Sequence, residues 1–358
     1  MSDNTEYMIK VYIGEILKNV SVVPLLYPNL KLRVKDDWLF AKDAFRFYTE
    51  PTVIITEDPG IADFFLIPHN YFYIKDRTDY IKCFSDLADQ YKKKILLFAY
   101  GDSSEQIDIP HTVIIRTSQY RSQMRPDEII MPGYNADLLS GPLQLRKKGD
   151  KPVVGFCGWA DFTRVRSKLK FFAKTLIFDL KKAYSRDPAY GAKRQGMWFR
   201  RKALSALRRS PHIERNFVVR MSYSGHKGTV IGDYTEVRNE YIRNIINSDL
   251  TLSIRGDGNF SYRFYETLSL GRIPLLLNTD CQLPLEDIIP YDKFALFVDY
   301  RDLNKIGEKT ADFYNSFGES EYAQKQKMAR EIFEKYLRID RFFDFLFKQE
   351  KIFNYIHD

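Results

Sequence analysis

The side chains best suited to chemistry gather in one short stretch of the C-terminal third of the chain. They are two arginines, two glycines, a serine, a tyrosine and a glutamate: Arg255, Gly256, Gly258, Ser261, Tyr262, Arg263 and Glu266. Glycines let backbone N–H groups approach a ligand closely, and the N-terminus of a helix attracts anions. A glycine loop that leads into a helix, with arginines beside it, therefore predicts a phosphate-binding site.

Arg263 and Glu266 indicate what this helix could bind. A cation in the first turn gains nothing from the helix dipole, so we expect an anion beside Arg263. Glu266 follows three residues later on the same helical face. Either the two side chains form a structural ion pair, or the arginine binds phosphate and the carboxylate binds ribose hydroxyls. The loop lacks the third glycine of a dinucleotide fingerprint and the Gly-Lys-Ser/Thr of a P-loop.

The elements that must position this site alternate between strands and helices. Apolar runs predict strands at residues 52–56, 63–67, 94–99, 112–116, 152–157, 216–221, 250–254, 273–278 and 294–298. Helical periodicity is found at residues 79–93, 165–184, 197–209, 235–248, 261–270 and 302–314. This alternation predicts an α/β protein built from βαβ units in doubly wound parallel sheets.

A charged stretch with glycine and proline, residues 137–151, separates two halves of the chain. Such a stretch is typical of a linker between domains. We therefore expect a first domain at residues 1–148 and a second at 149–319. The last segment, 320–358, is helical and rich in aromatic residues, and we expect it to pack back on the first domain.

The composition favours a folded protein with an anionic partner. The chain of 358 residues is 44% hydrophobic and carries a formal net charge of +8. Its three cysteines have no metal-ligand spacing, which is typical of a reducing compartment. The polar start is unlike a signal peptide, and no apolar run reaches the roughly 18 residues of a membrane span. These features predict a cytoplasmic protein.

Basic residues also cluster in a second helical segment, from Lys193 to Arg209. One interpretation is a solvated helix face. The other is contact with an anionic membrane or a charged acceptor, which would place the protein at the inner face of a membrane. Binding to nucleic acid is disfavoured because no stacking aromatics are interleaved with these cations on a recognisable module.

The stretch from Arg255 onward resembles a known family. Residues 255–277, with residues 278–287 after them, are similar to the C-terminal signature of the exostosin glycosyltransferases, family 47. The shared pattern is a glycine loop, Ser-x-Arg-hydrophobic-x-Glu, Gly-x-Ile-Pro and Leu-Pro-hydrophobic-Glu-Asp. Residues 58–68 and 153–158, the latter followed by Arg164 and Arg166, resemble the family more loosely.

The resemblance implies a GT-B fold, in which two Rossmann-like doubly wound domains face a central cleft. It implies an inverting, metal-independent transfer from a nucleoside-diphosphate sugar, with a UDP-sugar favoured over a GDP-sugar and no further cofactor. The acceptor would be a hydroxyl of an oligosaccharide or of a lipid-linked glycan. The chain lacks the membrane anchor and luminal cysteines of eukaryotic exostosins, so a bacterial or viral enzyme that builds a surface polysaccharide is expected.

Without a metal, cations must stabilise the leaving diphosphate, and Arg255, Arg263 and one of Arg164 or Arg166 are the candidates. An inverting transfer also needs a general base, for which we select His69 at the end of the strand 63–67. The equally open alternative is that this histidine only holds a loop. Four carboxylates are alternative candidates for the general base: Asp161, Glu57, Asp58 and Asp280.

The sequence leaves a second class of function open. A protein that binds a nucleotide sugar or a glycan without catalysis would keep the same loop and arginines and lose only the base. Formation of a glycosylated product, tested where donor binding is intact, separates the two.

Overall fold

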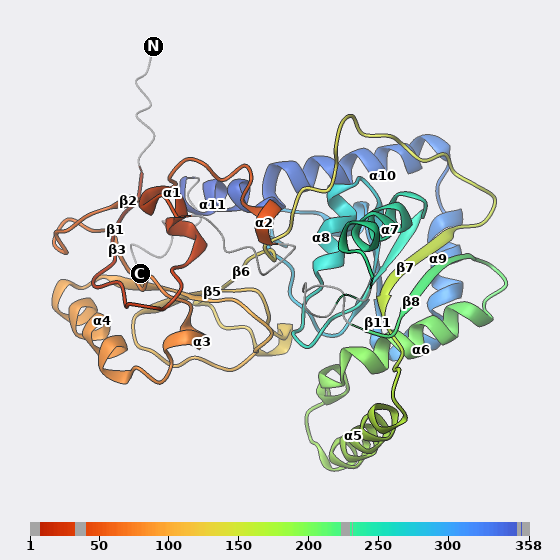
Figure 1. Ribbon diagram of the computed structural model, residues 1–358, viewed down its shortest axis with the longest axis horizontal. Coiled ribbons are helices and arrows are strands. Elements are labelled where there is room, and N and C mark those ends of the chain that lie inside the picture. The colour runs from red at the N-terminus through yellow and green to blue at the C-terminus, as the bar shows by residue number, and fades with distance from the viewer. Residues whose placement is uncertain (1–7, 33–40, 223–229, 231, 349–351, 353–358) are drawn as a thin grey trace.

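The computed structural model describes residues 8–32, 41–222, 230, 232–348 and 352. Two parallel sheets lie side by side, each with helices packed against it (Figure 1). The first sheet uses strands up to Ile130 and the second begins at Val153, on either side of the predicted linker. Within the described ranges, no helix is both long and apolar enough to cross a bilayer.

The first sheet has the strand order β2-β1-β3-β4-β5-β6, and all its neighbours are parallel. The strands are β1 (Lys10–Tyr12), β2 (Ile54–Ile55), β3 (Phe64–Leu66), β4 (Lys94–Ala99), β5 (Thr112–Arg116) and β6 (Glu128–Ile130). The helices of this half are α1 (Tyr27–Leu30), α2 (Ala41–Ala44), α3 (Tyr71–Ile74) and α4 (Thr78–Tyr91). The sheet is covered on both faces, because alternate residues of β4 enter two different apolar clusters.

The second sheet has the order β11-β10-β9-β7-β8, again all parallel. The strands are β7 (Val153–Trp159), β8 (Glu214–Arg220), β9 (Leu250–Ser253), β10 (Ile273–Asn278) and β11 (Leu296–Asp299). The helices are α5 (Val165–Tyr184), α6 (Gly196–Arg209), α7 (Tyr234–Ile246), α8 (Tyr262–Ser269) and α9 (Ile306–Asn315). The strand order reverses between β7 and β9, and such a switch point is where open α/β sheets bind ligands.

The C-terminal helices join the two halves. α10 (Glu319–Ile332) packs against α8, and α11 (Ile339–Lys348) lies over the first sheet (Figure 1). The ring of Phe343 on α11 lies 5.3 Å from that of Tyr48 and 6.1 Å from that of Phe98. The chain therefore returns to its first half at this end. Residues 349–351 and 353–358 of the predicted segment lie outside the described residues.

The two crossings between the halves are tied to each other. Arg330, near the end of α10, donates from Nη1 and Nη2 to the carboxylate of Asp137, at 2.6 and 2.9 Å. Asp137 belongs to the first crossing, between β6 and β7, and its side chain is buried. Nη1 of Arg338, which follows the second crossing, lies 3.8 Å from the same carboxylate. This buried ion pair therefore holds the two crossing segments together.

The predicted elements and the observed ones differ mainly at short strands. β1 and β6 were not predicted, because three residues show no clear alternation. The predicted helix 302–314 begins only at Ile306, since a 3₁₀ helix occupies Tyr300–Lys305. The predicted helix 320–358 is two helices with a π-helical turn, Phe333–Leu337, between them.

Candidate active site

The carboxyl edges of the two sheets meet. The backbone N–H of Gly258 donates to Oδ1 of Asp102, which follows β4, at 3.0 Å. The N–H of Asn259 donates to Oγ of Ser118, which follows β5, at 2.8 Å. Nη1 of Arg255 donates to the hydroxyl of Tyr120 at 2.6 Å. The glycine loop 255–260 is thus one of the surfaces through which the second half contacts the first.

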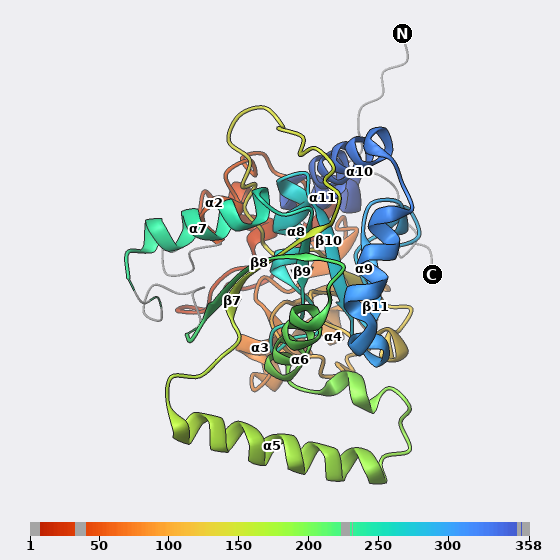
Figure 2. The ribbon, with the colours of Figure 1, turned by 90° about the vertical axis from the view of Figure 1, so that its right-hand side faces the viewer.

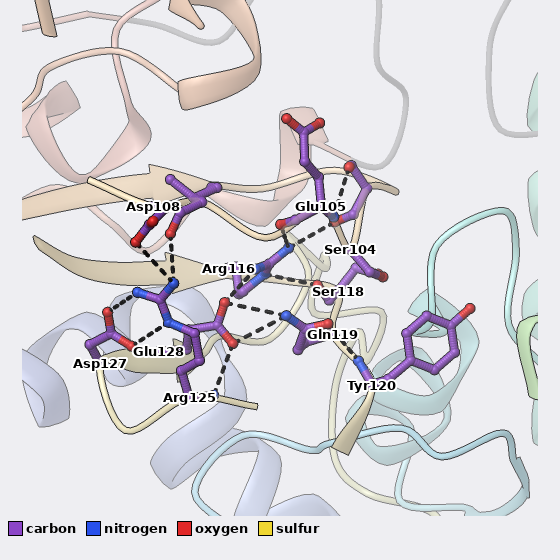
Figure 3. A network of polar contacts seen from close by, with 12 residues as sticks. Ser104, Glu105, Asp108, Arg116, Ser118, Gln119, Tyr120, Arg125, Asp127 and Glu128 are labelled. Carbon is purple, nitrogen blue, oxygen red and sulfur yellow. Dashed lines mark hydrogen bonds and ion pairs between the residues drawn. The ribbon is translucent and has the colours of Figure 1, made fainter. Parts of the chain in front are cut away.

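A buried network fixes the loop that receives these bonds (Figure 3). Arg116, at the end of β5, forms a fully buried ion pair with Glu128 of β6, with 2.5 Å between Nη1 and Oε1. Nε of Arg116 donates to the carbonyl of Ser118, and Nε2 of Gln119 donates to Glu128 at 3.2 Å. Because an unpaired buried charge is costly, these bonds hold residues 117–120 in one conformation.

The glycine loop differs from its predicted role as a phosphate cradle. Gly258 does serve a close backbone approach, since a Cβ there would lie 2.7 Å from Cα of Asp102. That approach, however, is to the first half of the same chain. Arg255 is buried and also donates to the carbonyls of Ala192 and Asp257. Arg255 and Gly258 therefore take part in the contact between the halves in this structure, whereas a Cβ on Gly256 would meet only Arg200 of the second half, at 3.9 Å.

Arg263 lies at the switch point of the second sheet. Its Nη2 donates to the carbonyl of Cys157 in β7 at 2.8 Å, and its Nη1 to that of Leu252 in β9 at 3.3 Å. Its guanidinium stacks over Phe156 at 4.6 Å, and a Cβ on Gly158 would lie 2.7 Å from Nη2. Nε is buried and has no hydrogen-bond partner among the described residues. A cation with an unused donor thus sits where such sheets bind ligands.

Glu266 does not pair with Arg263. Its carboxylate instead accepts from Nη1 of Arg238 at 3.0 Å and from the hydroxyl of Tyr241 at 2.5 Å, both on α7. Burial, reinforced by the Glu266 charge, raises the pKa of Tyr241 well above its ordinary value. Of the two alternatives that the sequence left open, the ion pair between Glu266 and Arg263 is not formed, because α7 supplies the partners of Glu266.

Ser261 and Tyr262 begin α8. Ser261 is the N-cap residue with extended backbone, but its side chain makes no capping hydrogen bond. Tyr262 packs into the segment that leaves the first sheet, where a Cβ on Gly133 would lie 2.6 Å from its ring. Both side chains are partly exposed, so both can meet a ligand at the start of α8.

His69 is fully buried. Its Nε2 accepts from the backbone N–H of Leu17 at 2.9 Å, and its Nδ1 lies 3.0 Å from the carbonyl of Ser21. Burial lowers the pKa of its imidazole. With both nitrogens engaged by backbone, the histidine holds the segment after β1, which is the alternative that the sequence left open.

The other predicted acids and cations lie apart from Arg263. Asp161 accepts from the N–H of Phe162 and from Nη1 of Arg201, and these bonds lower its pKa, which suits a base poorly. Asp280 accepts from Ser122 across the contact between the halves. The remaining residues are exposed, two at the start of α5 and two in the loop after β2: Arg164, Arg166, Glu57 and Asp58.

Two residues that the sequence reasoning missed lie at the meeting of the sheets. Asp102 is exposed, and desolvation beside the second half raises the pKa of its carboxyl, with Asp257 adding to the effect. Arg200 of α6 donates to the carbonyls of Trp159 and Arg255, both at 3.2 Å. Asp102 follows an apolar strand, as His69 does, and this position could have singled it out.

Three buried polar atoms at the edge of the first sheet have no partner among the described residues. They are Oδ1 of Asn70, Oδ1 of Asn135 and the hydroxyl of Tyr134. Asn70 follows β3, and the other two follow β6. Unsatisfied buried acceptors are rare, so this is the part of the first half best prepared to bind hydroxyl groups.

The basic segment from Lys193 to Arg209 is not a free surface helix. It divides into a 3₁₀ turn, Tyr190–Lys193, and α6, whose apolar side packs in the core of the second half. Arg208 and Arg209 are exposed at its end, whereas Arg200 points to the meeting of the sheets. No group of three His, Cys, Asp or Glu side chains that could hold a metal ion is found in the described part of the chain.

Two doubly wound parallel sheets with their carboxyl edges face to face are the GT-B arrangement that the resemblance implied. Residues 172–311, which include α8 and the glycine loop, match the Exostosin GT47 domain. This part of the chain is therefore similar to that domain.

Several solved structures resemble the chain at low sequence identity. The structure of TarM has a TM-score of 0.36 and 10% identity over 82% of this chain and 54% of its own. A variant of TarM from S. aureus, in complex with Fondaparinux, alpha-GlcNAc-glycerol and UDP, has a TM-score of 0.36 and 9% identity over 82% of this chain and 55% of its own. A glycosyltransferase from Rickettsia africae has a TM-score of 0.34 and 10% identity over 99% of this chain and 98% of its own. The chain thus spans about half the length of TarM, and no curated protein matches it.

Proposed function

We propose that the protein transfers a sugar from a nucleoside-diphosphate sugar to a hydroxyl of a glycan, with inversion and without a metal ion. The observation that carries this proposal is the position of Arg263. It lies inside the matched exostosin domain, at the switch point of the second sheet, and its Nε is unused. A uridine diphosphate sugar is the donor that we expect first.

In this proposal, cations take the place of a metal at the leaving diphosphate. Arg263 approaches the site from the start of α8, and Arg200 approaches from α6. A fixed guanidinium stabilises the negative charge that develops as the bond between the sugar and the diphosphate breaks. The bonding electrons leave with the diphosphate oxygen, so this charge is greatest in the transition state.

We assign the general base to Asp102 in place of His69. The acceptor oxygen attacks the anomeric carbon, and its proton passes to the Asp102 carboxylate. Asp102 suits this step because it is exposed at the meeting of the sheets, where an acceptor can reach it, and because desolvation raises its pKa. A carboxylate that holds its proton more firmly is a better base.

A panel of uridine, guanosine, cytidine and adenosine diphosphate sugars tests this function. Each is incubated with the protein and an oligosaccharide mixture, with and without a metal chelator, and mass spectrometry follows the products. We expect one nucleotide series to be consumed, a glycan to gain one sugar, and the chelator to leave the rate unchanged. Loss of turnover with chelator would refute the metal-free part.

The non-catalytic alternative is favoured by one observation. His69, the base that the sequence selected, is buried with both ring nitrogens engaged by backbone. Thermal shift against the same panel separates the two functions, since a ligand that binds the native state raises its melting temperature. A shift without any product would favour binding alone, and neither shift nor product would refute both.

A further inference from the structure

α5 lies at the margin of the second half, apart from the strands of its sheet (Figure 2). It carries a stripe of exposed apolar side chains. Its members recur every three or four residues: Val165, Leu169, Phe172, Leu176 and Leu180. Their exposed fractions are 71, 64, 58, 63 and 55%. Contiguous apolar side chains on one helical face, all in water, mark a surface that another apolar phase covers.

This stripe is not the contact that holds α5 on the protein. Phe171 is buried, and the ring of Phe178 lies 5.1 Å from that of Tyr190. At 3.6 residues per turn, Phe171 and Phe178 lie on the side opposite to the stripe. A hollow of about 520 Å³ separates part of α5 from α6. The helix is therefore already anchored by one apolar face, and its second apolar face is left over.

The charges beside the stripe indicate what covers it. α5 carries six basic residues, Arg166, Lys168, Lys170, Lys174, Lys181 and Lys182. Its single acidic residue, Asp179, is paired with Arg194. At 3.6 residues per turn, Arg166 and Lys168 lie along the two borders of the stripe, and Lys170 follows beyond Arg166. Their long side chains can extend to charged groups while their stems stay apolar.

We propose that α5 lies in the surface of an anionic lipid bilayer, with the stripe at the acyl boundary and the bordering cations, Arg166 and Lys168, on the phosphates. An apolar stripe with a cationic border is the pattern of a helix that lies in a membrane interface. A second copy of the chain fits less well, because two such helices face to face would bring like charges together. The proposal assigns membrane contact to α5 and not to the segment Lys193–Arg209, where it was one of two interpretations of the sequence.

Vesicle flotation tests this proposal with the whole chain. Wild-type protein should float with vesicles of phosphatidylcholine that contain phosphatidylglycerol, and remain below with phosphatidylcholine alone. The triple variant Leu169→Gln, Phe172→Gln, Leu176→Gln should bind about a hundredfold more weakly, because three large apolar side chains leave the bilayer. The matched control Ile61→Gln, Leu145→Gln, Ile288→Gln changes exposed apolar residues elsewhere and should float like the wild type.

A charge variant tests the anionic part. Arg166→Gln, Lys168→Gln, Lys170→Gln should weaken binding to anionic vesicles by about tenfold or more, since each cation near the surface contributes to the attraction. The control Lys82→Gln, Lys305→Gln, Lys327→Gln removes the same charge from exposed sites elsewhere and should have little effect. Melting temperatures of all variants should match the wild type, because every substituted side chain is at least partly exposed.

Three results would overturn the proposal. The first is equal flotation of wild type and stripe variant. The second is failure of the wild type to bind anionic vesicles. The third is a wild-type dimer in sedimentation equilibrium that the stripe variant converts to monomer without vesicle binding, which would assign the stripe to a second copy.

Discussion

The glycine loop and the first turns of α8 adjoin each other in the sequence but serve different parts of the molecule. The loop gives its N–H groups and Arg255 to the first half, at Asp102, Ser118 and Tyr120. The helix turns Arg263 toward the second sheet. One short motif therefore both joins the two sheets and presents a cation at the switch point. The glycine and arginine residues of such a loop can therefore serve the contact between two sheets and need not contact a ligand.

The largest effect should come from the loop's partner in the first half. Asp102→Asn keeps an oxygen that can accept from Gly258, so the contact survives while the base is lost. Turnover should fall by about 10²–10⁴-fold. The wild-type kcat/KM should fall as the pH drops through the Asp102 pKa, which lies above the ordinary carboxyl value, because only the carboxylate accepts a proton. If kcat/KM of the variant falls at low pH as that of the wild type does, the base is another residue.

Arg263→Ala tests the helix side of the comparison. We expect turnover to fall by more than about tenfold with the fold intact, since a cation on developing charge acts mainly in the transition state. Single-turnover rates and circular dichroism would measure the two separately. Arg243→Ala, an exposed arginine of α7, is the control. Equal turnover in both variants would remove Arg263 from the site.

Glu266→Gln tests whether the contact between α8 and α7 stabilises the fold. The substitution weakens the bonds from Arg238 and Tyr241, so the free energy of unfolding should fall by about 1–2 kcal/mol. Denaturant unfolding measures this loss. A rise in the KM for the donor without any loss of stability would instead indicate that the carboxylate leaves α7 to bind ribose.

Tyr120→Phe should have the smallest effect. It removes one hydroxyl from Arg255, which keeps its bonds to Ala192 and Asp257. Stability should fall by about 1 kcal/mol and turnover by no more than a few-fold. A loss of turnover as large as that of Arg263→Ala would mean that the loop is part of the catalytic site, and the contrast between loop and helix would be wrong.

The sequence predicted the elements better than their contacts. Residues 94–99, 112–116 and 273–278 read as apolar runs and are strands with those bounds. The partners of Arg255 and Glu266 lie on segments distant in sequence, so residue types near them gave no sign of Tyr120 or α7. The choice of a general base had the same difficulty. His69 and Asp102 both follow strands, and only the packing of the fold buries His69 and leaves Asp102 exposed.

The amphipathic helices also show that the sequence predicts an element better than its contacts. α5 and α6 both combine cations with apolar residues, and the sequence singled out α6 for its denser charge. The structure packs the apolar side of α6 into the core and leaves that of α5 in water. Periodicity identifies an apolar face but does not say whether the rest of the chain covers it.

The ion pair between Asp137 and Arg330 also has a mechanical meaning. The chain passes between the halves twice, and this buried pair joins the two passages. Pulling the passages apart would leave the charges of Asp137 and Arg330 buried without a partner, which is costly. The pair therefore opposes any motion of one half against the other that separates these two segments.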